Sequence, residues 1–224
     1  MSKEAAKKQQ SPVSGIIKDT LIIFIITLVA GGVLGFVYEL TKEPIENQKL
    51  AKMAAACAEV FREADAEGTL KDVESLTFTQ VEVNKSTVQK YAVEATDINA
   101  DITELYEARK SDGTLYGYVI AVETKEGYGG LIRIYMGVTM DRTVKGISIL
   151  EIHETPGLGM RAEEVLVPQF RNVSANEFTV TKKGSTSDSE IDAITSATIT
   201  SKAVTRGVNF GLKFFDGLTK GGEE

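Results

Sequence analysis

The chain has 224 residues, enough for one domain of ordinary size and additional segments, and its 42% apolar and 25% charged content is typical of a folded protein. The net charge of −7 is unevenly distributed, because residues 1–19 sum to +2 and the remainder to −9. An acidic body without a stripe of Lys and Arg argues against a nucleic-acid partner, which would need clustered positive charge.

Cysteine and histidine are too scarce for most metal chemistry. A single Cys57 and a single His153 exclude an internal disulfide, an iron–sulfur cysteine set and the usual His-based metal sites. Cys57 follows three alanines, an arrangement with a faint likeness to a lipid-attachment box. Charged residues separate it from the apolar run, so a buried or interfacial thiol is the preferred interpretation.

An uncharged run of 18 residues, Leu21–Tyr38, predicts a membrane helix. At 1.5 Å per residue it spans about 27 Å, close to the roughly 30 Å hydrocarbon core, and we assign residues 20–40 to a transmembrane anchor in contact with lipid. The alternative is a cleaved signal peptide, whose apolar core would be shorter and followed by a small-residue cleavage site. Four lysines before the run and three beyond it favour a cytoplasmic N-terminal segment, residues 1–19, and an exported main domain.

The region that follows, residues 41–104, is expected to lead away from the membrane. Apolar residues at helical spacing predict an amphipathic helix that opens at Pro44 and ends at Gly68. Residues 71–103 alternate in a manner typical of strands.

Three further segments predict antiparallel hairpins: Leu115–Thr124, Leu131–Met140 and Val144–His153. The second alternates with period two, which indicates a half-buried strand. The glycines at 127–130 are interpreted as turn residues and not as a phosphate cradle, since no helix follows them.

The C-terminal part completes an α+β domain, with helices flanking an antiparallel sheet. From Ser201 onward, apolar residues recur every three or four positions, which predicts a helix that Gly221 and Gly222 stop. We place the domain at residues 105–218, with a tail at 219–224.

A polar segment precedes this helix and ends in the run DAITSAT at residues 192–198. By composition alone, this is a Ser/Thr loop in which Thr200 or Ser201 caps the helix. The run also resembles the flavinylation signal D-x-x-[ST]-G-A-T of bacterial FMN-binding domains. In that family a flavin transferase moves FMN from FAD onto the last threonine as a phosphoester. The resemblance makes Thr198 the acceptor and Asp192, Thr195 and Ala197 the other matching positions, while Ser196 stands where glycine is usual. A serine there would hinder a backbone conformation with positive φ.

A second segment, ETPGLG at residues 154–159, resembles another signature of the same family; by itself it is a Pro-Gly turn. In the family this turn lies near the flavin. The resemblance therefore implies a set of cofactor contacts around Thr198: Glu154, Thr155, Gly157, Leu158, Thr195, Ser196, Ala197, Thr200 and Lys202.

The predicted site is physically consistent with a bound phosphodiester. One negative charge would lie ahead of a helix N-terminus, where free N–H groups and the helix dipole favour an anion. Lys202 and Arg206 either contact that charge or form a solvated helix face; the sequence leaves both open.

Within this family the chain most resembles the G subunit of the Rnf complex, which couples electron transfer between ferredoxin and NAD to ion translocation. The resemblance implies an FMN-carrying electron relay without a complete catalytic site of its own, working with other membrane subunits in the cell membrane. The C subunit of the Na⁺-translocating NADH:quinone oxidoreductase is the first alternative, although it is generally longer. A membrane-anchored sensory or binding module without flavin is the alternative of a different class.

Overall fold

The computed structural model describes residues 12–64, 70–71, 76–84, 86, 88, 91 and 98–220. The chain divides into two compact units, residues 1–52 and 53–224. Helix α1, Pro12–Glu59, contributes to both, and its apolar stretch Gly15–Lys42 is long enough to cross a membrane. Every side chain from Ile16 to Thr41 in this stretch is exposed within the protein, which suits contact with lipid tails.

The predicted break between an anchor and a second helix at Pro44 was wrong, because α1 continues through this residue. A proline inside a helix removes one backbone hydrogen bond, while the Ala-, Leu-, Lys- and Glu-rich sequence around it favours helix on both sides. The predicted end at Gly68 was also wrong, and Gly68 itself lies outside the described residues. The helix ends at Glu59 because Val60 and Phe61 turn into a core in which they are at most 1% exposed.

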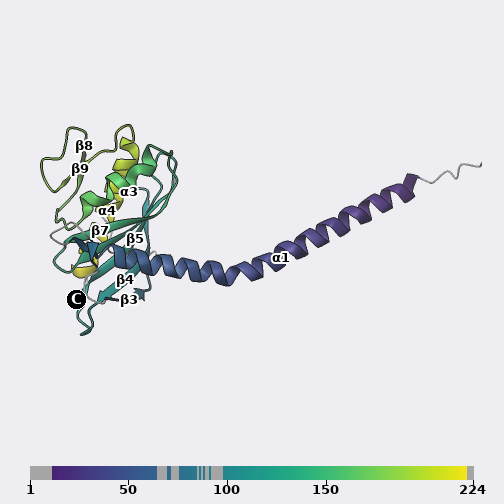
Figure 1. The fold of residues 1–224 in the computed structure, drawn as a ribbon, viewed down its shortest axis with the longest axis horizontal. Helices are drawn as coiled ribbons and strands as arrows, with labels where there is room; N and C mark the ends of the chain where they lie inside the picture. The colour runs from purple at the N-terminus through teal and green to yellow at the C-terminus, as the bar shows by residue number, and fades with distance from the viewer. Residues whose placement is uncertain are drawn as a thin grey trace, which may run out of the picture. The chain divides into compact units, whose positions relative to one another are not determined.

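A five-stranded antiparallel sheet in the order β3-β4-β5-β6-β7 forms the centre of the second unit (Figure 1). Its strands are β3 (Thr77–Val81), β4 (Ala100–Arg109), β5 (Leu115–Thr124), β6 (Ile132–Thr139) and β7 (Val144–Ile152). The three predicted hairpin segments thus form neighbouring antiparallel strands, with bounds within a residue of those expected. The α+β class is confirmed.

Residues 71–103 were predicted to alternate as strands throughout, and this was only partly right. Within this range β3 joins the main sheet; just before it, two short strands, β1 (Glu63–Ala64) and β2 (Leu70–Lys71), pair with each other. Between β3 and β4, however, Ser86, Val88 and Tyr91 are helical. Val88 is buried in the main core, so burial of an apolar face outweighs the strand-like local composition.

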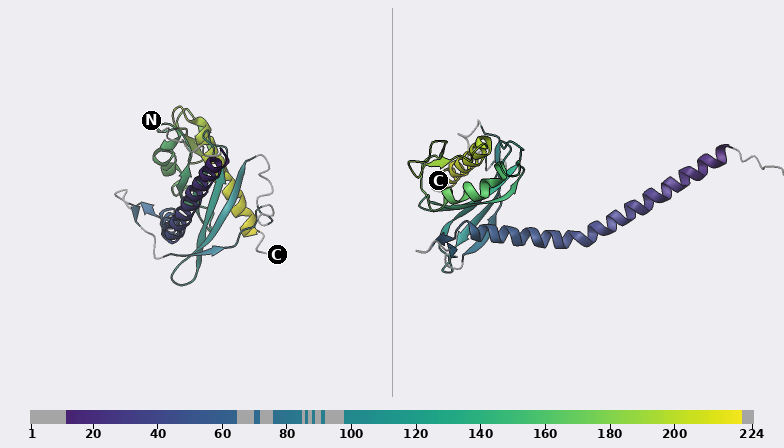
Figure 2. Two further views of the ribbon diagram at one scale, coloured as in Figure 1. Left: turned by 90° about the vertical axis from the view of Figure 1, so that its right-hand side faces the viewer. Right: turned by 45° about the horizontal axis from the view of Figure 1, so that its top comes forward.

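Both faces of β5 and β6 are largely buried, which corrects the prediction of a half-buried strand at β6. Along β5, Val119 and Ala121 point to one core while Ile120 and Val122 point to the other. Helix α4 (Thr198–Lys220) covers the second of these faces, and the end of α1 from Met53 onward covers the first (Figure 2). The period-two pattern therefore corresponds here to two buried faces of different size. It does not indicate one buried face and one solvent-exposed face.

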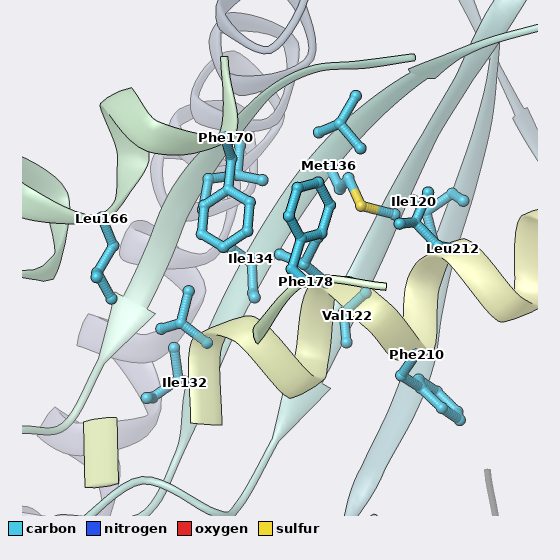
Figure 3. Packing of buried hydrophobic residues seen from close by; sticks show 14 of the residues in the cluster. Ile120, Val122, Ile132, Ile134, Met136, Leu166, Phe170, Phe178, Phe210 and Leu212 are labelled. Carbon is cyan, nitrogen blue, oxygen red and sulfur yellow. The ribbon is translucent and has the colours of Figure 1, made fainter. Parts of the chain in front are cut away.

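The core beneath α4 is built largely from bulky aliphatic and aromatic side chains. Leu166 lies between the short helices α3 (Ala162–Val165) and η2 (Val167–Phe170), and Phe170 is the last residue of η2. Phe178 lies in the loop that follows (Figure 3). Phe170 and Phe178 meet edge to face with ring centroids 5.2 Å apart. Their burial fixes the loops that lead to the polar segment before α4.

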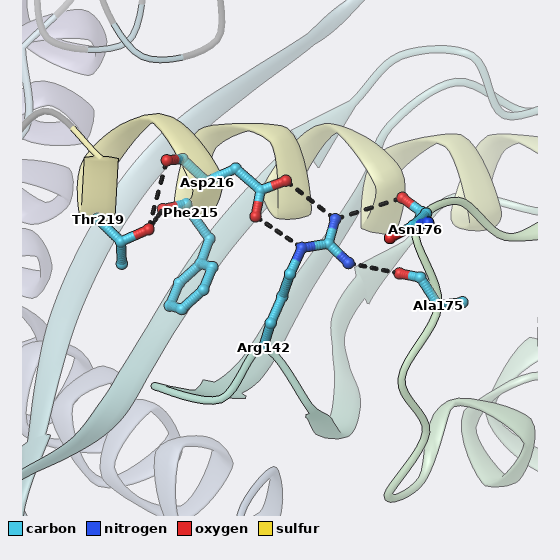
Figure 4. A network of polar contacts seen from close by, with 6 residues as sticks. All are labelled: Arg142, Ala175, Asn176, Phe215, Asp216 and Thr219. Atoms are coloured by element: carbon cyan, nitrogen blue, oxygen red, sulfur yellow. Dashed lines mark hydrogen bonds and ion pairs between the residues drawn. The ribbon is translucent and has the colours of Figure 1, made fainter.

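The C-terminal half of α4 is tied to the β6–β7 turn by one arginine (Figure 4). Arg142 donates from Nε and Nη2 to the two carboxylate oxygens of Asp216, at 2.6 and 2.9 Å, and from Nη1 to the Ala175 carbonyl at 2.6 Å. A bidentate guanidinium–carboxylate pair restricts orientation as well as distance. The C-terminal part of the helix is therefore tied to the β6–β7 turn and to the segment at Ala175.

The core on the α1 side contains a polar cluster. The hydroxyls of Tyr106 and Tyr135 both donate to Glu104, and the thiol of Cys57 lies in the same core with 2% exposure. Burial raises the pKa of Cys57 to about 12 and that of Tyr106 to about 12. The expectation of a buried thiol at position 57 is confirmed.

Candidate functional site

The polar segment reaches α4 through a short parallel pair, β8 (Thr179–Thr181) and β9 (Glu190–Asp192). The side chain of Gln169 binds both main-chain groups of Asp192, accepting from its N–H at 2.7 Å and donating to its carbonyl at 3.2 Å. The Asp192 carboxylate contacts the Ser185 hydroxyl at 3.4 Å. These contacts of Asp192 thus hold the chain in place where β9 leads into the segment before α4.

Helix α4 begins at Thr198, three residues earlier than predicted. The composition suggested that Thr200 or Ser201 caps the helix. Both residues instead lie inside its first turn. Ser201 instead accepts from the Ile194 N–H and donates to the Ala197 carbonyl, both at 2.9 Å. The first intrahelical bond runs from the Ser201 N–H to the Ala197 carbonyl, so the amides of residues 198–200 have no acceptor within the helix.

The turn just ahead of the helix has an unusual backbone. Ser196 has a φ of +64°, the left-handed region that favours glycine. The strained conformation directs residues 197 and 198 into the helix start, with an Ala197 N–H bond to the Ile194 carbonyl at 3.0 Å. Position 196 therefore has the backbone for which the family's usual glycine is suited.

A cavity of about 560 Å³ opens where this turn meets the segment that follows β7. It is lined by residues from both motifs and from the β5–β6 turn: Tyr128, Glu154, Thr155, Leu158, Gly159, Ser196, Ala197, Thr198, Ile199 and Thr200. The two motifs are about 40 residues apart in sequence and share one cavity. Its volume lies in the range usual for small-molecule and cofactor sites.

Most of the predicted contacts line this cavity, but three do not. Thr195 is exposed outside it, Gly157 forms the turn with a φ of +76°, and Lys202 is exposed to solvent. Arg206 pairs with Glu126, Nε to Oε2 at 3.3 Å. These positions shape or flank the site without lining it.

Three lining residues were not predicted: Tyr128, Gly159 and Ile199. The glycines at 127–130 form a turn, as expected, but this turn also approaches the end of β7 closely. A Cβ on Gly129 would lie 1.9 Å from the His153 carbonyl oxygen. This close approach brings Tyr128 to the cavity. The three glycines around this tyrosine were the feature of the sequence that could have predicted its place in the site.

The wall and the mouth of the cavity suit a flat aromatic ring carrying an anionic tail. Tyr128, Leu158 and Ile199 are 73%, 40% and 52% exposed, and they form an apolar rim. The free amides of the first turn of α4 lie at the Thr198 end, where an anion is favoured. Within the described part of the chain, no group of three His, Cys, Asp or Glu side chains is placed to hold a metal ion.

Comparisons with known proteins agree with this geometry. The FMN-binding domain family matches residues 127–213, which include every residue lining the cavity. The family described as the RnfG N-terminal region matches residues 7–60. The G subunit of the Na⁺-translocating ferredoxin:NAD⁺ oxidoreductase complex of Acetobacterium woodii is 34% identical over 221 residues, covering 97% of this chain and all of that one. The chain belongs to this family of G subunits.

A second relative, the G subunit of the proton-translocating ferredoxin:NAD⁺ oxidoreductase complex of Clostridium ljungdahlii, is 37% identical over 63% of this chain and 77% of its own. The solved structure of Shewanella oneidensis NqrC matches 52% of this chain and 61% of its own length, at 23% identity and a TM-score of 0.44. Because the structural similarity is low, the α+β architecture is assigned from the strands and helices of this chain alone. The apolar stretch of α1 and the family together show that the protein is membrane-associated.

Proposed function

We propose that this protein is the FMN-carrying electron relay of an Rnf-type complex, with the FMN joined through its phosphate to Thr198. One observation carries the proposal: the two motifs share a cofactor-sized cavity, and Thr198 lies both in its wall and at the first residue of α4. When bound, the isoalloxazine ring supplies the electron-carrying chemistry.

Each part of the site would have a separate task in holding the flavin. The Thr198 hydroxyl forms the covalent bond, and the amides of the first turn receive the remaining negative charge of the phosphodiester. Leu158, Ile199 and Tyr128 offer apolar surface to the ring. The covalent bond keeps the cofactor from being lost by diffusion.

Attachment would follow from an exchange of phosphate bonds. The Oγ1 of Thr198 attacks the FMN phosphorus of FAD, the pyrophosphate bond breaks, AMP leaves, and the hydroxyl proton passes to water. The co-reactant is FAD, delivered by a flavin transferase. The product gains the mass of FMN less one water.

Other members of the complex would then supply the remaining redox centres, consistent with the relatives' names. The N-terminal segment would lie in the cytoplasm and the FMN domain outside it, supported by the lysines that precede the apolar run. A fusion reporter at the C-terminus, active only on the exported side, tests this orientation.

Thr198→Ala tests the attachment. We expect folded protein with no covalent flavin, measured by intact mass and by in-gel fluorescence after denaturation, when the chain is produced together with a flavin transferase. Thr198→Ser is the matched control, since it keeps a hydroxyl and should retain some flavin. A fluorescent band from the alanine variant would contradict the proposal, as would a wild-type mass without FMN.

A further inference from the structure

One carboxylate in the wall of the cavity is held in an unusual way. Glu154 lies between two glycines: a Cβ on Gly127 would lie 2.5 Å from Oε1, and a Cβ on Gly159 would lie 2.7 Å from Oε2. Real Cβ atoms essentially never approach so closely. Any larger residue at either position would displace the carboxylate, so the two glycines create the space that it occupies.

One oxygen of this half-buried carboxylate is shielded from water and has no hydrogen-bond partner. Among the described residues, Glu154 Oε1 is one of three buried side-chain polar atoms that have no hydrogen-bond partner. The described ion pairs include none at Glu154, whereas Glu151, three residues earlier, pairs with Arg133 at 3.5 Å and His153 at 3.1 Å. Native proteins rarely leave such a group unsatisfied, because its desolvation is not offset.

An isolated carboxylate of this kind acts strongly on its surroundings. A partly buried charge is screened less than one at an open surface, and its field extends into the cavity that it lines. Reduction of a flavin adds electron density to the ring, and a nearby negative charge opposes this addition.

We propose that Glu154 lowers the reduction potential of the flavin bound in this cavity, and that Gly127 and Gly159 position its carboxylate to do so. The inference rests on the proposed function, since it requires a flavin at this site. It assigns Glu154 an electrostatic task that is separate from holding the cofactor.

Glu154→Gln tests the proposal in the full-length, flavinylated chain. The amide has the shape of the carboxylate without its charge, so the midpoint potential should become more positive by at least a tenfold change in the equilibrium, about 30 mV for two electrons. The shift should depend less on salt than a shift caused by an exposed carboxylate, because Oε1 is buried. Glu154→Asp, which keeps the charge, should restore most of the wild-type potential.

Glu151→Gln is the matched control, because it removes a neighbouring carboxylate that is paired and does not line the cavity. Its potential should stay close to that of the wild type, with any shift suppressed by salt. A Glu154→Gln shift no larger than the control's would overturn the inference while leaving the covalent flavin intact. So would a Glu154→Gln protein that takes up no flavin, since Glu154 would then act in loading. A wild-type chain without FMN would overturn the proposed function and this inference together.

Discussion

Both faces of the central strands β5 and β6 are largely buried, but the two cores on these faces differ in composition. The face beneath α4 is covered by large aliphatic and aromatic side chains that also fix the loops leading to Thr198. The face beneath the end of α1 is smaller and includes the hydroxyls of Tyr106 and Tyr135 and the thiol of Cys57. The first core therefore supports the segments around the candidate cofactor site, while the second makes the residues that follow the apolar stretch of α1 a structural part of the domain.

The strongest test of this comparison is Phe61→Ala on the α1 side. Phe61 is 1% exposed and packs on Phe78 and Tyr116, so its truncation should destabilise the domain by about 3 to 5 kcal/mol. Denaturant unfolding of the full chain in detergent, followed by near-ultraviolet circular dichroism, measures the change. Phe24→Ala is the control: Phe24 is 61% exposed within the anchor, so this variant should leave domain unfolding unchanged. Equal effects of the two variants would show that the residues after the anchor do not form a core.

A smaller effect is expected from pH, and it should come from the α1 face. The pKa of Cys57 is raised from its ordinary value of 9.0 to about 12, so the unfolded chain loses the thiol proton first. The stability contributed by the protonated thiol is complete below pH 9 and is lost as the pH rises toward 12. By pH 10.5 the loss from this group is on the order of 2 kcal/mol.

Cys57→Ala isolates this contribution, because the buried tyrosines remain in both proteins. The variant should lose less stability than the wild type between pH 8 and 10.5, measured by denaturant unfolding at each pH. Identical slopes for the two proteins would mean that the thiol is not buried as described.

The smallest effect is expected at the site, from Ser196→Gly. Relief of the positive φ should stabilise the protein by about 1 kcal/mol or less, and flavin loading should be retained. Ser189→Gly, at a position that is not among the positive-φ residues, should instead destabilise the protein, because glycine increases the freedom of the unfolded chain and the hydroxyl contact with Ser187 is lost. A loss of thermal stability in Ser196→Gly exceeding that of Ser189→Gly would contradict the strain at position 196.

Much of the fold could be predicted because its signals are local. Period-two alternation and short turns determined the three hairpin strands, and an uncharged run determined the membrane helix. What the sequence could not give was the environment of the outer face of β6, since Tyr135 and Gly137 become buried only when residues distant in sequence pack on them. The end of α1 was mispredicted for the same reason.

The residues of the candidate site could likewise be predicted only where the signal is local. The two motifs indicated which segments to bring together, and the cavity contains residues of both. Tyr128 was missed because the close approach of its turn to His153 is tertiary, and the start of α4 was misplaced because Ser201 looked like a cap but bonds backward inside the first turn. Glu154 could be named as a candidate contact, but the burial of its Oε1 without a partner depends on residues that are distant in sequence.

The position of Thr198 at the first residue of α4 would limit how far an attached cofactor could move. A group bound there is separated from the most deeply packed helix of the domain by a single side chain, and the β-branch of threonine restricts rotation about its first torsion. The phosphate would then lie close to the helix, while the ribityl chain between the phosphate and the ring keeps its own rotatable bonds. The distance from the ring to the next electron centre would therefore depend on the apolar contacts that hold the ring in the cavity as well as on the covalent bond.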